Sequence, residues 1–202
     1  MQVLSELQRS GKALLPKRLI VSVVFIDIRG FTGLCERLNP DELSELLNRH
    51  YFSPLDSIIF HHNGTLDKHI GDSIMGIFGA PIGGGDDAAR AVLTALAVRE
   101  EIAGINGSIP DAQRRIAVGI GIATGEVMAG IFGSPWKKEY TVFGAPVNFA
   151  SRLEKIARGD QILICSETAR LVENLVRIEK IPSPVIRGLD RTPDVFSVLG
   201  KK

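Results

Sequence analysis

The chain has 202 residues, of which 45% are hydrophobic and 23% are charged, as is usual for one globular domain. Its 24 basic residues almost balance its 23 acidic ones, and a net charge of +1 excludes a general attraction to nucleic acid or to an anionic membrane. The two cysteines form no CxxC motif and are expected to be free thiols in a reducing cytoplasm. Function must therefore depend on a local site.

The apolar run from Leu19 to Ile26 follows Lys17 and Arg18, which is the charge pattern of a signal peptide. The run is far shorter than the roughly 20 apolar residues of a membrane span, and no small-residue cleavage site follows it. Asp27 comes immediately after it. The run is therefore predicted to be a buried strand, and we expect no part of the chain to insert into a membrane.

Residues 1–16 are mostly polar, with leucines at helical spacing. They are expected to form an N-terminal extension, or the linker from an upstream regulatory domain of a larger protein that could itself be tethered to a membrane. Residues 17–202 contain no repeat or low-complexity segment, and they are predicted to form one domain.

The predicted elements follow one another closely. In chain order they are a buried strand at 19–28, a helical turn from 31, a helix from 40 to about 62, strands at 65–70 and 73–78, a helix from 87 to about 104, strands at 116–124, 126–132 and 140–143, a helix at 146–157, a strand at 161–165, a helix at 166–175 and an edge strand at 195–199.

Local signals set several of these boundaries. Asn39, followed by Pro40 and two acidic residues, is a strong helix start. Gly71–Asp72 between two strand-like runs is typical of a tight hairpin, and Gly125 is expected to separate two further strands. Asp86 is expected to cap the alanine-rich helix. The order of elements predicts an α+β fold with a ferredoxin-like βαββαβ core, in which helices pack against a mostly antiparallel sheet.

Asp27 is the first candidate functional residue, because it ends an apolar strand just before a helix begins at Phe31 and Thr32. Its carboxylate is expected at the rim of the sheet, beside helical N–H groups that suit phosphate oxygens. The alternative is that Asp27 merely caps the helix.

A second candidate segment is DKHIGD, from Asp67 to Asp72. Asp72 lies in the predicted hairpin turn, where aspartate is common for structural reasons alone. Strand alternation places Lys68 on the same face as Ile70, an inward position where lysine is rare unless it is paired. The alternative is that Lys68 reaches out to solvent.

A third candidate pair is Asn148 and Arg152, which lie four residues apart on a predicted helix and therefore share one face. A neutral hydrogen-bonding group beside a permanent cation suits an oxygen that gains negative charge during a reaction. The alternative is an ordinary polar helix face.

Together these segments resemble the class III adenylyl/guanylyl cyclase catalytic domain, over about residues 17–200. The motifs that carry the resemblance, in family order, are FIDIRGFT at 25–32, KHIGDSIM at 68–75, GIATGEVMAG at 121–130 and YTVFGAPVNFASRL at 140–153. The resemblance implies the class III nucleotidyl cyclase fold and, as the activity, conversion of ATP to cyclic AMP and pyrophosphate.

The resemblance also implies a two-metal site. Asp27 and Asp72, with the main-chain carbonyl of Ile28, would hold two Mg²⁺ or Mn²⁺ ions, for which oxygen ligands are suited. One ion would activate the ribose 3′-hydroxyl for attack on the α-phosphate, and the other would hold the triphosphate. Phe31 and Thr32 would contact the substrate.

The remaining family residues would contact the ribose, the phosphates and the base. Asn148 would orient the ribose, and Arg152 would neutralise charge at the α-phosphorus. Lys68 and Thr141 would contact adenine, because lysine donates to N1 while a threonine hydroxyl can accept from the 6-amino group. The family positions Lys68, Thr141, Asn148 and Arg152 of one subunit opposite Asp27 and Asp72 of another, which implies a homodimer with two shared sites.

Two positions refine or weaken the resemblance. Thr141, where transmembrane mammalian members have aspartate, is similar to the subgroup often stimulated by bicarbonate. Arg187 stands where many members have a lysine that contacts the terminal phosphates, and arginine differs from lysine in reach and geometry.

Three other functions compete with adenylyl cyclase. A guanylyl cyclase of this family usually has glutamate in place of Lys68. A non-catalytic cyclase-like domain usually lacks a metal aspartate or the Asn/Arg pair, whereas this chain has Asp27, Asp72, Asn148 and Arg152. A diguanylate cyclase would need a GG[DE]EF turn at the hairpin, where this chain has His69-Ile-Gly-Asp-Ser.

Overall fold

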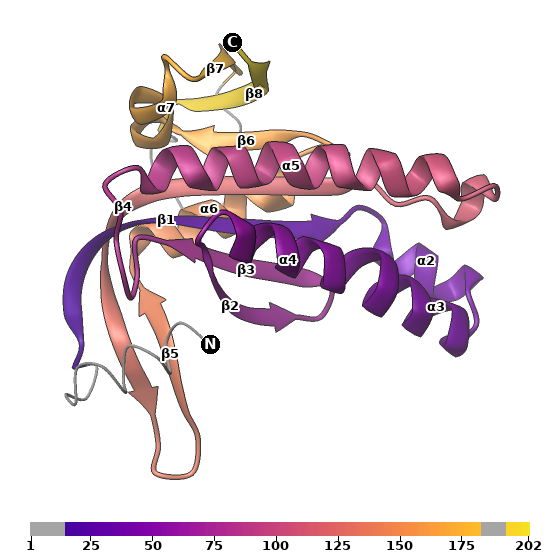
Figure 1. The fold of residues 1–202 in the computed structure, drawn as a ribbon, viewed down its shortest axis with the longest axis horizontal. Coiled ribbons are helices and arrows are strands. Elements are labelled where there is room, and N and C mark those ends of the chain that lie inside the picture. Colours follow the sequence, from indigo (N-terminus) through magenta and orange to yellow (C-terminus); the bar gives the residue numbers. More distant parts are fainter. Residues whose placement is uncertain (1–14, 183–192) are drawn as a thin grey trace.

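The computed structural model describes residues 15–182 and 193–202, and it arranges them around a sheet (Figure 1). The strands are β1 (Lys17–Ile28), β2 (Thr65–Ile70), β3 (Ser73–Phe78), β4 (Val118–Gly133), β5 (Lys138–Phe143), β6 (Ile162–Cys165), β7 (Val176–Lys180) and β8 (Val195–Lys201). The helices are α2 (Phe31–Arg37), α3 (Pro40–Leu47), the π-helical η1 (Asn48–Phe52), α4 (Ser53–His61), α5 (Asp87–Ser108), the short 3₁₀ helix η2 (Ala112–Arg114), α6 (Ala145–Ile156) and α7 (Ser166–Val172).

Within the described residues the strand order is β2-β3-β1-β4-β6-β8-β7, with β5 paired to β4 beside this path. The first part, β2-β3-β1-β4, has antiparallel pairing throughout, and its strands are connected through α4 and α5 in the order βαββαβ. β6 adds to β4 in parallel, and β8 and β7 continue the sheet in antiparallel pairs. The predicted α+β fold with a mostly antiparallel sheet is confirmed.

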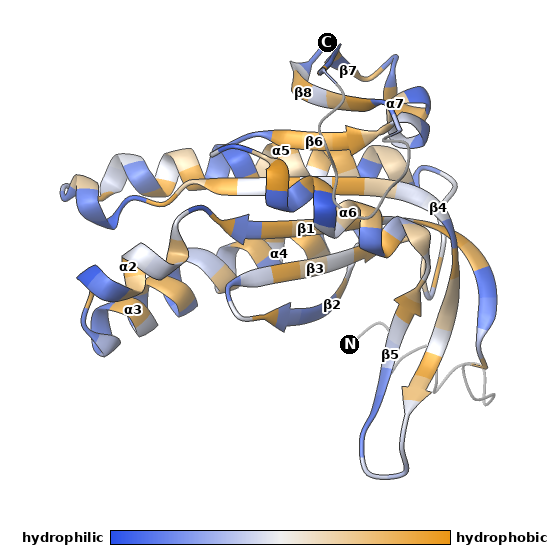
Figure 2. Cartoon of the chain, turned by 180° about the vertical axis from the view of Figure 1, so that it is seen from behind, coloured by the Kyte–Doolittle hydropathy of each residue, from blue (hydrophilic) through white to orange (hydrophobic). Residues whose placement is uncertain are grey.

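Different helices pack on the two faces of the sheet. Side chains alternate along β1, so that Val24 and Ile26 pack in the cluster beneath α4 and α5, whereas Val23 and Phe25 pack in the cluster beneath α6. Figure 1 shows α4 and α5 in front of the sheet, and Figure 2 shows the opposite side, where α6 crosses it. Asp27, two positions after Phe25 on β1, and Lys68, which pairs with Met75, lie on the face beneath α6, whereas the Ile28 side chain packs on the other face.

The helix predicted from residue 40 begins as expected. The Asn39 side chain accepts from the main-chain N–H of Glu42, and the Glu42 side chain accepts from that of Asn39, which is a complete capping box. The helical path continues through η1 into α4 in spite of Pro54, and the turn directly before this proline is π-helical.

The predicted break at Gly125 is wrong, because β4 is one continuous strand of 16 residues. Gly125 pairs with Val21 in the middle of the β1–β4 ladder. A Cβ atom there would lie 2.8 Å from Cγ of Pro146, at the start of α6. The glycine therefore allows a helix to approach the sheet closely, and it forms no turn.

Other boundaries also differ from the prediction. The alanine-rich helix α5 ends at Ser108 rather than near residue 104, and the carboxylate of Asp86 accepts from Nε of Arg90 at 2.7 Å instead of capping the helix. α7 ends at Val172, three residues early. β8 lies between β6 and β7, so the expected edge strand is an inner strand, and β7 was not predicted at all.

The structure also bears on the two cysteines and on helices that could cross a membrane. Cys35 is exposed and Cys165 is buried, and both are free thiols as predicted. Among the described residues, no helix combines the length and the apolar character that crossing a membrane requires.

Candidate active site

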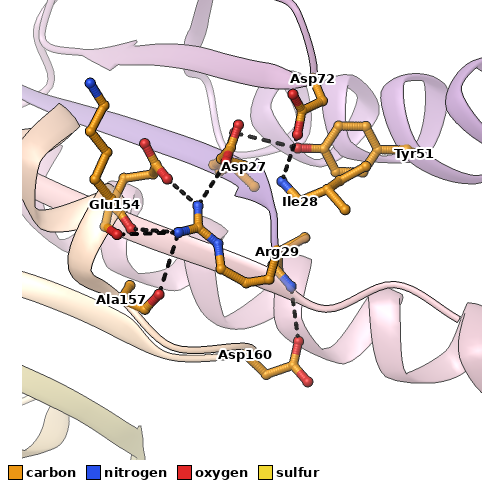
Figure 3. A network of polar contacts seen from close by, with 11 residues as sticks. Asp27, Ile28, Arg29, Tyr51, Asp72, Glu154, Ala157 and Asp160 are labelled. Atoms are coloured by element: carbon orange, nitrogen blue, oxygen red, sulfur yellow. Dashed lines mark hydrogen bonds and ion pairs between the residues drawn. The ribbon is translucent and has the colours of Figure 1, made fainter. Parts of the chain in front are cut away.

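Asp27 and Asp72 lie next to each other, although they are 45 positions apart in the chain. Pairing of β1 with β3 sets Ile26 opposite Ile74, so the end of β1 reaches the turn that carries Asp72. The main-chain N–H of Ile28 donates to Oδ2 of Asp72 at 3.2 Å (Figure 3). The structure thus brings the three residues predicted as metal ligands together.

The electrostatic setting of these carboxylates suits a cation. Burial, followed by the negative charges of Glu154 and Asp72, raises the pKa of Asp27 to about 7. Two carboxylates with a neighbouring main-chain carbonyl form an oxygen donor set that fits Mg²⁺ or Mn²⁺. No cluster of three or more His, Cys, Asp or Glu in the described parts of the chain could hold a metal ion alone. Mg²⁺ commonly binds through one or two carboxylates, with substrate phosphates and water as further ligands.

Arg29 and Glu154 belong to the same cluster and were missed from the sequence. Nη2 of Arg29 lies 2.8 Å from Oδ2 of Asp27 and also pairs with the buried carboxylate of Glu154 on α6. Nη1 donates to the main-chain carbonyl of Glu154 at 3.2 Å and, at 3.5 Å, to that of Ala157 (Figure 3). Arg29 therefore fixes the end of β1 to the end of α6. The signal available in the sequence was an arginine two residues after Asp27, which on a strand lies on the same face.

Asn148 and Arg152 both line a cavity of about 460 Å³, although Asn148 itself is exposed. The cavity lies between α6, the middle of β4 and the start of α7, where Thr124 and Ser166 also line it. Of the described residues that line it, none is Asp27 or Asp72.

The direction of these side chains separates them from the carboxylate cluster. Glu154, which contacts Arg29, follows Arg152 by two positions, or about 200° around an α-helix. Arg152 and Asn148 therefore project from the side of α6 that faces away from Asp27. Within one chain, the structure brings the predicted metal ligands together and the predicted ribose and phosphate contacts together, but it does not join the two groups.

Lys68 and Thr141 meet at a third residue, Asp67. The Thr141 hydroxyl, on β5, donates to Oδ2 of Asp67 at 3.1 Å. Nζ of Lys68 lies 3.6 Å from the same oxygen and 3.0 Å from Oε2 of Glu139. This proximity is consistent with the prediction that Lys68 and Thr141 contact one base. The candidate segment also contains Asp67, but no role was predicted for it.

The prediction that Lys68 points inward with Ile70 is wrong. Ile70 is 54% exposed and the Lys68 side chain is 34% exposed, because β2 is the edge strand of the described sheet. Lys68 pairs with Met75, whose side chain is in the cluster beneath α6, so Lys68 lies on the open part of that face.

The other residues predicted to contact the substrate are Phe31, Thr32 and Arg187. Phe31 begins α2 and packs against the core, and Thr32 beside it is exposed. Their contacts with substrate stay predictions. Arg187 lies outside the described residues.

The sequence matches the family model of the adenylate and guanylate cyclase catalytic domain over residues 17–193. Adenylate cyclase 1 of Rhizobium meliloti is 28% identical over 187 residues, which are 89% of this chain and 27% of that protein. The chain spans about a quarter of the length of the curated relatives it matches.

The solved structures that are similar over nearly the whole chain include an adenylyl cyclase and a guanylyl cyclase. The adenylyl cyclase CyaB from P. aeruginosa has a TM-score of 0.88 at 32% identity, covering 94% of this chain and 98% of that one. The guanylyl cyclase Cya2 has a TM-score of 0.84 at 34% identity, covering 93% of this chain and 95% of that one. Relatives thus include enzymes named for both purines, and a choice between ATP and GTP must come from this chain's own residues.

Proposed function

Because this chain belongs to the family of adenylate and guanylate cyclase catalytic domains, we propose that it converts ATP to 3′,5′-cyclic AMP and pyrophosphate. In this reaction the ribose 3′-oxygen forms a bond to the α-phosphorus, and the bond from that phosphorus to the bridging oxygen of the β-phosphate breaks. The observation that carries the choice of ATP is that Lys68 and Thr141 lie together at Asp67 and offer one donor and one acceptor.

Asp27 and Asp72, with the main-chain carbonyl of Ile28, would hold two divalent cations, Mg²⁺ or Mn²⁺. When bound, such cations make the 3′-hydroxyl more acidic and neutralise charge on the triphosphate and on the leaving pyrophosphate. Arg29 supports this arrangement from the protein side, because it holds the Asp27 carboxylate at 2.8 Å while its other nitrogen is fixed to α6.

Asn148 and Arg152 would act on the ribose and on the α-phosphate. The Asn148 amide can hydrogen-bond the ribose, and the permanent charge and planar donors of Arg152 suit the oxygens of a phosphorus that gains charge in the transition state. Both side chains project away from the carboxylate cluster of their own chain. We therefore infer a homodimer in which Asp27 and Asp72 of one subunit and Asn148 and Arg152 of the other complete each of two sites.

The base would be held by Lys68 and Thr141. The hydrogen bond to Glu139 and the charge of Asp67 raise the pKa of Lys68, so its ammonium stays protonated and can only donate. Adenine offers an acceptor at N1 and a donor at its 6-amino group, and guanine offers the reverse at the matching positions. This complementarity supports ATP as the substrate.

Lys68→Glu tests the base assignment. A carboxylate facing adenine N1 sets acceptor against acceptor, and an unpaired buried polar group costs about 1–3 kcal/mol, so kcat/KM for ATP is expected to fall about 5- to 150-fold. The kcat/KM for GTP is expected to fall much less. Lys137→Glu is the matched control, because Lys137 also pairs with Glu139 but its side chain is 81% exposed. An equal loss with both nucleotides would contradict the assignment.

Bicarbonate stimulation is a separate expectation that rests on Thr141 and its subgroup. Turnover of ATP is measured at fixed pH and ionic strength while sodium bicarbonate replaces sodium chloride. We expect turnover to rise with bicarbonate. A flat response would remove bicarbonate as an activator and leave the cyclase assignment unchanged.

Guanylyl cyclase is the second candidate function, favoured by the similarity to Cya2. It predicts comparable or faster cyclisation of GTP by the wild-type protein. Lys68 argues against it, because lysine cannot accept the N1–H of guanine.

The assignment of residues 17–202 to the catalytic domain, and of residues 1–16 to a linker, also stays a prediction.

A further inference from the structure

The carboxylate of Asp67 is buried in an unusual way. Its side chain is fully buried, at 0% exposure, and in the described structure its Oδ1 atom has no hydrogen-bond partner. Burial raises the pKa of Asp67, and the nearby charge of Lys68 and the hydroxyl of Thr141 oppose that rise. A buried carboxylate with so few partners is costly for stability, which points to a role other than packing.

A β-bulge gives Asp67 its position. The β2–β3 ladder pairs Leu66 with Gly76 and Lys68 with Met75, so Asp67 is an extra residue without a partner on β3. Consecutive residues of a regular strand point to opposite faces, whereas a bulge redirects one of them. The side chains of Asp67 and Lys68 can therefore approach each other and reach β5 together.

The contact with Asp67 determines whether the Thr141 hydroxyl donates or accepts a hydrogen bond toward a bound base. A threonine hydroxyl has one hydrogen to donate and lone pairs to accept, so alone it could bind either the 6-amino group of adenine or the 6-oxygen of guanine. The carboxylate can only accept, and the Thr141 hydroxyl donates its hydrogen to Oδ2 of Asp67. Toward a bound base, this hydroxyl is then left as an acceptor.

Lys68 has donors to spare for the same base. Its ammonium carries three N–H groups, of which one donates to Glu139 at 3.0 Å, while Asp67 lies 3.6 Å away as an ion-pair partner, so that even if one N–H group points toward Asp67 a third remains. The third is free to reach a base nitrogen. One carboxylate thus lies beside both groups, fixing the hydroxyl as an acceptor and attracting the ammonium.

We propose that Asp67 is a specificity-determining residue, which selects ATP over GTP by binding the hydrogen of the Thr141 hydroxyl and so presenting an acceptor to the 6-amino group. This proposal rests on the proposed adenylyl cyclase function. Asp67 itself is buried behind Thr141 and acts through it, so it is a positioning residue that does not contact the base.

Asp67→Ala and Asp67→Val are the two test variants. Both remove the acceptor, and valine also fills part of the space and suits a strand, so that one variant can report if the other does not fold. Once free, the Thr141 hydroxyl can donate to guanine O6. The ratio of kcat/KM for ATP to kcat/KM for GTP is therefore expected to fall about tenfold, which is the effect of one reversed hydrogen bond.

A double-mutant cycle separates this role from a general effect on the fold. In a Thr141→Val background there is no hydroxyl to orient, so adding Asp67→Ala is expected to change the ATP/GTP ratio by less than about twofold. His69→Gln is the matched control, because His69 lies two residues after Asp67 on β2 and contacts Asp56 and Phe52, neither of which has a role in binding the base. It should preserve the ratio.

The outcomes distinguish failure of the proposed role of Asp67 from failure of the proposed adenylyl cyclase function. If the wild-type protein prefers ATP and both Asp67 variants keep that preference while losing rate equally on both nucleotides, the orienting role of Asp67 is wrong and the adenylyl cyclase function stands. If the wild-type protein prefers GTP or cyclises neither nucleotide, the proposed function is wrong, and the role of Asp67 with it.

Discussion

Asp27→Ala and Asp72→Ala are each expected to lower cyclic AMP formation by about 10³-fold or more, because a bound metal ion contributes several kcal/mol to transition-state stabilisation and each ~1.4 kcal/mol is a tenfold change in rate. Both aspartates are only partly buried, and Asp72 lies in a turn, so both variants are expected to remain folded. Turnover is measured with saturating Mg²⁺ and again with Mn²⁺. Near-wild-type turnover of either variant would contradict the two-metal assignment.

Asp41→Ala is the matched control for these substitutions. It removes an exposed carboxylate from the first turn of α3 and is expected to leave turnover within about twofold of wild type.

Thermal stability gives a second readout that does not depend on turnover. Burial and the charges of Glu154 and Asp72 raise the pKa of Asp27 to about 7, so the surroundings oppose its negative charge. Asp27→Asn keeps the shape and removes the charge, and at pH 8 without metal it is expected to be at least as stable as the wild-type protein. Mn²⁺ should raise the melting temperature of the wild-type protein and have a much smaller effect on Asp27→Asn. Equal stabilisation of both proteins would mean that Mn²⁺ binds elsewhere.

Two variants that are inactive alone are expected to recover activity when they are mixed. Arg152→Ala should lose about 10²–10³ in rate, as expected for removal of a preorganised transition-state donor, and Asp27→Ala is expected to lose more. In a mixed dimer, one site carries both lesions and the other carries none. Each heterodimer should therefore regain at most about half of the wild-type activity, because a twofold dimer has two equivalent sites.

The control for this experiment is a mixture of Asp27→Ala with Asp72→Ala. Both lesions lie in the half-site that one chain contributes alone, so every site of that heterodimer contains one lesion and no rescue is expected. The activity of the wild-type protein per milligram should also fall on dilution, as dimers dissociate. Absence of rescue in the first mixture, with heterodimers demonstrated by mass, would mean that the site is not built across an interface.

Residues in motifs at strand ends and turns could be predicted from the sequence. Asp27 and Asp72 stand out as candidates because an apolar strand and a Gly-Asp turn are local features, whereas their role as metal ligands was implied by the resemblance to the cyclase family. Their proximity then follows from antiparallel pairing. Asn148 and Arg152 were identified because i and i+4 share a helix face wherever the helix lies. In each case the signal is contained within a few consecutive residues.

What was missed depends on contacts between distant segments. Glu154 is informative only beside Arg29, which is 125 positions away. Gly125 was misread as a turn, because the sequence does not show that Pro146 packs against it. Asp67 was overlooked because nothing local predicts the β-bulge that turns it toward Thr141.

The central claim is that this protein is an adenylyl cyclase, and the most direct test is to incubate the purified wild-type protein with Mn²⁺ and either ATP or GTP, and to quantify the cyclic product of each. The account predicts that cyclic AMP and pyrophosphate form in equal amounts from ATP, and that kcat/KM for GTP is lower by about tenfold or more, as mismatched hydrogen bonds to the base require. Equal or faster formation of cyclic GMP, or no cyclic product from either nucleotide, would contradict it.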